Sequence, residues 1–146
     1  MITIIDRSNM QIALELSRRS KAIRAKVGCL LVTTDQIMIG AYNGTPSGWD
    51  NCCEDVHETE LFEHLVTKSS VIHSELNAIL HAARQGVSVK GATLYVTLSP
   101  CVSCSAMISQ VGIKRVVYLN EYRDTTGVDV LREHGIIVDK LGDWKQ

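Results

Sequence analysis

Proline, aromatic residues and excess charge of either sign are all scarce in this sequence. The chain of 146 residues has two prolines, 5% aromatic residues and a net charge of −1. A protein that coats nucleic acid needs a basic surface, so this class is excluded. No apolar run reaches the roughly 18–20 residues of a membrane-spanning helix, and the N-terminus contains no stretch of signal-peptide length. We therefore expect a cytoplasmic protein that binds neither nucleic acid nor membranes.

The cysteines are better suited to metal binding or catalysis than to a disulfide framework. There are five of them, an odd number, and no signal peptide points to an oxidising compartment. With 45% hydrophobic and 21% charged residues the chain has the composition of a folded protein. No linker, repeat or low-complexity segment divides it, so we expect one domain over residues 1–146.

Hydrophobic periodicity predicts an alternation of helices and strands. Ser8 and Gln11 predict the capping box of a first helix that ends near Arg19. The other expected helices begin near 74 and 100 and cover 124–134. The expected strands are 27–32 and 36–42, paired as a hairpin, then 92–98, 115–119 and 136–138. This order indicates an α/β fold with helices on both faces of a sheet that is parallel in its second half.

Residues 43–70 show no sustained period and are predicted to form a long loop. The segment contains glycine and proline together with a concentration of Cys, His and Glu. A loop of this length inside a compact domain is usually either functional or disordered.

Two short clusters carry the chemistry: His73 with Glu75, and Pro100 followed by Cys101 and Cys104. Imidazole and thiolate are zinc ligands, and two cysteines three residues apart lie one helical turn from each other. Three ligands leave one corner of a tetrahedral zinc open, which is typical of a catalytic site. Glu75 faces away from the metal and is free to carry protons. The spacing HxE with PCxxC is the signature of zinc-dependent nucleobase deaminases.

The sequence resembles the zinc-dependent cytidine and deoxycytidylate (dCMP) deaminase family, most closely its bacteriophage-type members. The matching stretches are SKAIRAKVGCLLV, GAYNGTPSGWDNCCED, HSELNAILHAARQG, GATLYVTLSPCVSC and GIKRVVY. The resemblance implies a three-layer α/β/α fold with a five-stranded mixed sheet, and hydrolysis of dCMP to dUMP and ammonia. It also implies that His73, Cys101 and Cys104 hold Zn²⁺ and that Glu75 transfers protons to ring N3 and the leaving amine.

The resemblance implies a set of substrate-binding residues as well. They are Asn43 for the deoxyribose, the backbone of Ser74 for the base, Arg24, Tyr122 and Arg123 for the phosphate, and Ser99. Arginine suits a phosphate because its guanidinium can bind it through two hydrogen bonds. The alternative for Arg24 and Arg123 is an ordinary solvated surface position.

Family members are also regulated, and the stretch with Tyr42 and Gly44 matches the loop of their effector site. The resemblance implies activation by dCTP with Mg²⁺, inhibition by dTTP and a homohexamer. Asn-Gly is also a common turn dipeptide, so an ordinary turn is the alternative.

Similar phage enzymes bind a second, structural zinc, for which Cys52 and His64 match. Ala22 and Val71 stand where those enzymes have a cysteine and a glutamate, so the inherited site is incomplete. The residues that could complete a rearranged site are Cys53, Glu54, His57 and Glu63. A solvated loop with unused thiols is the alternative.

Two other functions share part of this pattern. A cytidine deaminase or another nucleobase deaminase uses the same zinc chemistry on a different substrate. A non-enzymatic zinc module needs neither Glu75 nor an open coordination position, and in that case the cysteines and His73 serve only the fold.

Overall fold

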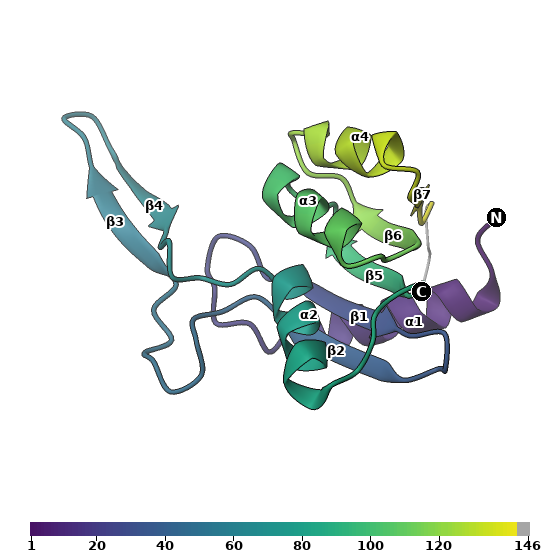
Figure 1. Cartoon of the computed structure of the whole chain (residues 1–146). Helices are drawn as coiled ribbons and strands as arrows, with labels where there is room; N and C mark the ends of the chain where they lie inside the picture. The colour runs from purple at the N-terminus through teal and green to yellow at the C-terminus, as the bar shows by residue number, and fades with distance from the viewer. Residues whose placement is uncertain (143–146) are drawn as a thin grey trace.

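The computed structural model of the protein describes residues 1–142. It contains a five-stranded sheet in the order β2-β1-β5-β6-β7 and a separate two-stranded sheet, β3-β4 (Figure 1). The helices are α1 (Ile4–Ser17), α2 (Ser74–Gln85), α3 (Val102–Gln110) and α4 (Thr126–Glu133). The strands are β1 (Gly28–Val32), β2 (Met38–Tyr42), β3 (Glu54–Glu58), β4 (Glu63–Thr67), β5 (Thr93–Leu98), β6 (Arg115–Asn120) and β7 (Ile137–Lys140). Within the described part of the chain, no helix is long and apolar enough to cross a membrane.

The five-stranded sheet is mixed, and its parallel half lies at the C-terminal end of the chain. Strand β1 pairs antiparallel with both β2 and β5. Strands β5, β6 and β7 run parallel to one another. Both findings confirm the predicted mixed sheet and its parallel second half.

Helices cover both faces of this sheet, which confirms the predicted three layers (Figure 1). All five residues of β1 are buried, and their side chains alternate between the two faces. Leu30 packs with Met10 and Ala13 of α1 on one face. Leu31 packs on the opposite face, in the core to which α2, α3 and α4 contribute their apolar residues.

The N-cap of α1 lies five residues before the predicted N-cap Ser8, so that prediction is wrong. Thr3 is the N-cap, and its hydroxyl accepts the backbone N–H of Asp6 at 3.2 Å. The Asp6 carboxylate accepts the Thr3 N–H at 2.7 Å and completes the box. Asp6 also accepts hydrogen bonds from Arg115 and Tyr95, so tertiary contacts support the earlier start.

The other helices and strands that the sequence predicts lie within about two residues of their predicted bounds. Helix α2 begins at Ser74 and ends at Gln85. Its C-cap is Gly86, whose φ of 67° is the left-handed conformation that favours glycine. Helix α3 begins two residues after Pro100, with Cys101 as its N-cap. Both candidate metal-binding clusters therefore lie at helix N-termini.

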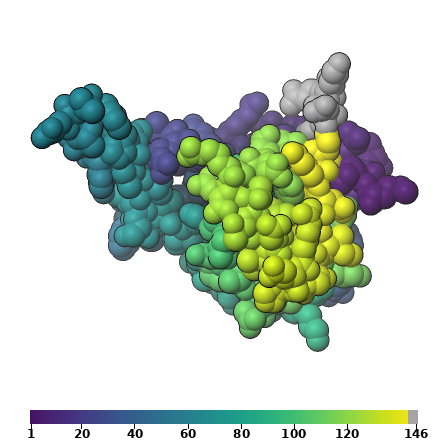
Figure 2. Space-filling view, turned by 90° about the horizontal axis from the view of Figure 1, so that it is seen from above, coloured from purple at the N-terminus to yellow at the C-terminus, as the bar shows by residue number. Residues whose placement is uncertain are grey.

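The predicted loop over residues 43–70 is wrong in part, because it contains the hairpin of β3 and β4. The two strands pair antiparallel from Glu54 opposite Thr67 to Glu58 opposite Glu63. The hairpin projects away from the five-stranded sheet and its helices (Figures 1 and 2). Most of its side chains are exposed, so its strands lack the apolar alternation that marks a half-buried strand.

Candidate active site

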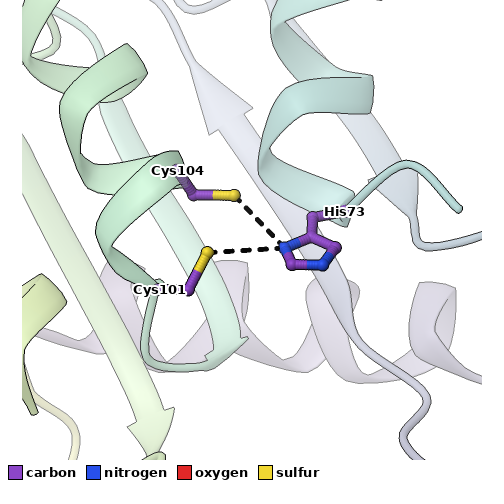
Figure 3. Close-up of side chains that lie close together, drawn as sticks. All are labelled: His73, Cys101 and Cys104. Carbon is purple, nitrogen blue, oxygen red and sulfur yellow. Dashed lines mark hydrogen bonds between the residues drawn. The ribbon is translucent and has the colours of Figure 1, made fainter. Parts of the chain in front are cut away.

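His73, Cys101 and Cys104 lie together where α2 and α3 begin (Figure 3). His73 is the N-cap of α2 and Cys101 the N-cap of α3, while Cys104 lies in the first turn of α3. Nδ1 of His73 is 3.6 Å from Sγ of Cys101 and 3.4 Å from Sγ of Cys104. The ligand atoms of the three residues lie within 4.8 Å of one another.

These distances fit a tetrahedral zinc ion. Bond lengths of about 2.3 Å to sulfur and 2.1 Å to nitrogen place those atoms roughly 3.6 Å apart around the ion. The observed separations of 3.6 and 3.4 Å agree with this value. Among residues 1–142 this is the one group of three or more such side chains close enough to share a metal ion.

Contacts among the three side chains shift the pKa of each of them. Hydrogen bonds with Cys104 and His73 lower the pKa of the Cys101 thiol to about 4. The hydrogen bond with Cys101, together with burial, raises the pKa of the Cys104 thiol. The pKa of His73 is raised because its ring binds Cys101. A zinc ion replaces the protons of such a cluster, since it binds thiolates and a neutral imidazole.

Glu75 lies in the first turn of α2 and is 4% exposed. Burial raises the pKa of this carboxyl group, although hydrogen bonds from Cys104 and Ser74 oppose the effect. The hydroxyl of Ser74 donates to Oε1 of Glu75 at 2.9 Å. The thiol of Cys29 in β1 donates to the Ser74 carbonyl oxygen at 3.1 Å and ties this turn to the sheet.

A cavity of about 300 Å³ opens beside the metal-binding group. Its wall contains all the predicted substrate-binding residues: Arg24, Asn43, Ser74, Ser99, Tyr122 and Arg123. His73, Glu75 and Cys101 line the same cavity. Residues from five separate parts of the chain thus meet at one site.

Asn43 and Ser99 shape this cavity through hydrogen bonds to the backbone. Oδ1 of Asn43 accepts the Val27 N–H, and its Nδ2 donates to the Ala25 carbonyl, both at 2.9 Å. The hydroxyl of Ser99, after the end of β5, accepts the Tyr122 N–H at 2.7 Å. Both side chains therefore hold the loops that bear other residues of the wall.

Comparison with known proteins identifies the family. Residues 4–120 match the family described as the cytidine and deoxycytidylate deaminase zinc-binding region. The chain belongs to the cytidine and deoxycytidylate deaminase family. This assignment confirms the resemblance seen in the sequence, and the family's zinc-binding character agrees with the grouping of His73, Cys101 and Cys104.

Individual members of this deaminase family are similar over most of the chain. The deoxycytidylate deaminase of Enterobacteria phage T4 is 38% identical, covering 88% of this chain and 86% of the relative. The human deoxycytidylate deaminase is 36% identical, covering 80% of this chain and 65% of the relative. The crystal structure of the dCMP deaminase from cyanophage S-TIM5, in complex with dCMP and dUMP, has a TM-score of 0.85 and 40% identity. It covers 97% of this chain and 99% of its own.

Four residues predicted for an effector loop or a second zinc lie outside the cavity wall of this deaminase: Tyr42, Gly44, Cys52 and His64. Tyr42 ends β2, and Gly44 forms an isolated β-bridge with Ile72. The Cys52 thiol donates to the Glu54 carbonyl oxygen at 3.3 Å. His64 pairs with His57 across the hairpin. Within residues 1–142, Cys52 and His64 belong to no group of three candidate metal ligands.

Two polar residues of the wall, Glu54 and Thr67, were missed as cavity residues. The sequence predicts Glu54 only as a candidate ligand for a second zinc. Both residues lie at the base of the β3–β4 hairpin, which the sequence did not predict. A single charged residue beside two cysteines carries no signal that could have placed it in the cavity. The wall also contains Ala22 and Val71, the two apolar residues at the incomplete second zinc site.

Proposed function

We propose that this protein is a dCMP deaminase that hydrolyses dCMP to dUMP and ammonia. The observation that carries the proposal is the grouping of His73, Cys101 and Cys104 at one edge of a cavity whose wall contains the buried Glu75. The named phage relatives and the S-TIM5 enzyme with its bound dCMP and dUMP support this substrate. We assign the whole chain to a single deaminase domain.

His73, Cys101 and Cys104 would hold one zinc ion through nitrogen and sulfur. Three protein ligands leave one coordination position open, as in other catalytic zinc sites. Zinc bound there supplies a water molecule whose pKa is lowered toward neutrality. Both helix N-termini favour negative charge at this place, which helps the thiolates to form.

Glu75 transfers the protons of the reaction. It takes up the first proton, which water loses as its oxygen bonds to C4, and delivers this proton to ring N3. It then takes the second proton from the new C4 hydroxyl group and passes it to the amine. The C4–N bond breaks, ammonia leaves and the C4 carbonyl of dUMP forms. Burial raises the pKa of this carboxyl group, which suits a side chain that must both accept and donate protons near neutral pH. The hydrogen bond from Ser74 restricts the orientation of the carboxylate.

The six predicted substrate-binding residues of the wall bind and orient the nucleotide. Arg24, Tyr122 and Arg123 are assigned to the 5′-phosphate, because a guanidinium group can bind a phosphate through two hydrogen bonds. Asn43 is assigned to the deoxyribose, and Ser99 and the backbone N–H of Ser74 complete the substrate site. The position of all six side chains around one cavity supports this division.

Metal content and regulation are also proposed for this chain. We propose one zinc per chain, since residues 1–142 contain one suitable group, and metal analysis that finds two would contradict this.

The match at Tyr42 and Gly44 supports a homohexamer that dCTP with Mg²⁺ activates and dTTP inhibits. Identical dCMP saturation curves with and without dCTP would refute the activation. Free thiols at Cys101 and Cys104 are consistent with work in a reducing cytoplasm.

The decisive experiment follows deamination by ultraviolet absorbance with dCMP, cytidine and dCTP offered in parallel. We expect dCMP to be converted fastest. The Glu75→Gln variant should lose about 10²- to 10⁴-fold in turnover while it keeps its zinc and its fold. Faster conversion of cytidine would indicate a nucleoside deaminase, and full activity of Glu75→Gln would refute the role of this residue.

A further inference from the structure

The base of the β3–β4 hairpin holds the chain segment that carries Arg24. Oε1 of Glu54 accepts the backbone N–H of Ile23 at 2.7 Å and that of Arg24 at 3.1 Å. Glu54 lies 30 residues from Arg24 along the chain, in the first position of β3. It is 7% exposed and forms part of the cavity wall. The hairpin and the loop between α1 and β1 are therefore joined beside the proposed substrate.

The side chain of Arg24 forms a hydrogen bond with the opposite strand of the same hairpin. Its Nη1 donates a hydrogen bond to Oγ1 of Thr67 at 3.1 Å. Thr67 faces Glu54 in the hairpin register and also lines the cavity. One cross-strand pair thus binds both the backbone and the guanidinium group of Arg24.

Glu54 is a buried carboxylate that is satisfied by hydrogen bonds instead of an ion pair. Within the described residues no Lys, Arg or His lies within ion-pair distance of its carboxylate. A buried carboxylate without a cation is costly unless hydrogen bonds satisfy it, and here two backbone N–H groups do so. A negative charge would also oppose phosphate binding, so its place in this wall needs a compensating benefit.

That benefit is the ordering of Arg24. An exposed arginine samples many rotamers, and binding a ligand must restrict them at a cost in entropy. Arg24 is exposed, yet its backbone and its guanidinium group are already held. Contacts that restrict it before the ligand arrives reduce this cost and strengthen binding.

We propose that Glu54 and Thr67 are positioning residues that hold Arg24 for the 5′-phosphate, and thereby set the preference for dCMP over deoxycytidine. This inference rests on the proposed function. It gives the projecting hairpin a role in substrate selection, although neither Glu54 nor Thr67 takes part in the zinc chemistry.

The test compares the steady-state kinetics of dCMP and deoxycytidine in the zinc-loaded protein. Glu54→Ala and Thr67→Val should each raise KM for dCMP about 3- to 10-fold and leave kcat nearly unchanged. Deoxycytidine has no phosphate, so its kcat/KM should not change. Glu54→Gln keeps an acceptor oxygen and should restore most of the affinity lost in Glu54→Ala. In an Arg24→Ala background, Thr67→Val should have no further effect.

Two matched controls lie on the same hairpin but outside the cavity wall. Asp55→Asn removes an exposed neighbouring carboxylate, and Thr59→Val removes a hydroxyl that bonds within the far turn. Both should leave the KM for dCMP unchanged. Thermal unfolding verifies that each variant is folded. If Glu54→Ala does not fold, Thr67→Val and Glu54→Gln still decide the question.

The outcomes separate this inference from the proposed function. A wild-type protein that does not deaminate dCMP overturns both. Normal dCMP turnover, with Thr67→Val altering dCMP and deoxycytidine equally or altering neither, overturns the positioning role alone. A loss in Thr59→Val as large as that in Thr67→Val would assign the effect to general loosening of the hairpin and would also overturn it.

Discussion

Replacing Arg115 with methionine should cause a large loss of stability, because it removes the cation that joins α1 to the sheet. Nη1 of Arg115 donates to Oδ1 of Asp6 at 2.7 Å, and Nη2 lies 3.3 Å from Oδ2. The same guanidinium group binds Asp139 of β7 at 2.7 and 2.8 Å. The carboxylate of Asp6 is 2% exposed. Methionine keeps the apolar stem but leaves this buried charge without a cation.

The expected cost is about 3 kcal/mol. Removal of one partner from a buried ion pair typically destabilises a protein by about 3–5 kcal/mol. The lower end applies here because Asp6 keeps its hydrogen bonds from Thr3 and Tyr95, and the Arg115 side chain is 20% exposed. Urea unfolding at a fixed zinc concentration measures this difference. The double variant Asp6→Asn with Arg115→Met should recover more than 1 kcal/mol, since no buried charge is then left unpaired.

The pH dependence of stability provides an independent check. Burial alone would raise the pKa of Asp6, but hydrogen bonds from Arg115, Thr3 and Tyr95 outweigh it and hold the pKa well below its usual value. The folded state therefore binds this proton less readily than the unfolded state does. The resulting stability is fully present above the unfolded pKa of about 3.9 and is lost as the pH falls below it.

We therefore expect the stability difference between the wild type and Asp6→Asn to shrink below about pH 4. Protonation of the metal ligands affects both proteins alike, so their difference isolates Asp6. A loss below 1 kcal/mol in Arg115→Met at neutral pH would refute the buried-pair explanation. So would a difference from Asp6→Asn that does not change as the pH falls.

Two further substitutions test the packing around the metal-binding helix. The Ser105 hydroxyl is buried without a hydrogen-bond partner among the described residues, so Ser105→Ala should raise the free energy of unfolding by about 1 kcal/mol; a lower melting temperature would contradict this. A methyl group at Gly127 of α4 would collide with the backbone of Pro100 and Cys101. Gly127→Ala should therefore cost about 1–3 kcal/mol and reduce the zinc content, and full zinc occupancy would show that Cys101 is not displaced.

The parts of the structure that sequence reasoning found are those set by local spacing. Cys101 and Cys104 share one helical turn, and the HxE motif places His73 and Glu75 where α2 begins. The metal centre could therefore be predicted once the starts of these two helices were predicted. The sheet could be predicted because β1 and β5 are buried and apolar. Gly86 marked the end of α2 through a conformation that side chains disfavour.

The errors arose where long-range contacts decide the structure. The start of α1 depends on Asp6, whose partner Arg115 lies 109 residues away, while the local pattern at Ser8 looked equally suitable for a cap. The β3–β4 hairpin has little apolar surface, so periodicity could not reveal its strands.

Glu54 shows why the sequence predicts the metal centre but not the whole substrate-binding site. Zinc requires particular donor atoms, and helical geometry fixes the spacing between them. A short sequence motif is therefore sufficient to predict the zinc ligands. Holding Arg24 requires only an acceptor oxygen at the right place, and many residue types at many positions could provide one. The contact between Glu54 and Arg24 spans 30 residues and depends on a hairpin that projects from the sheet. We therefore expect residues that determine substrate specificity to be harder to predict from sequence than catalytic residues and metal ligands.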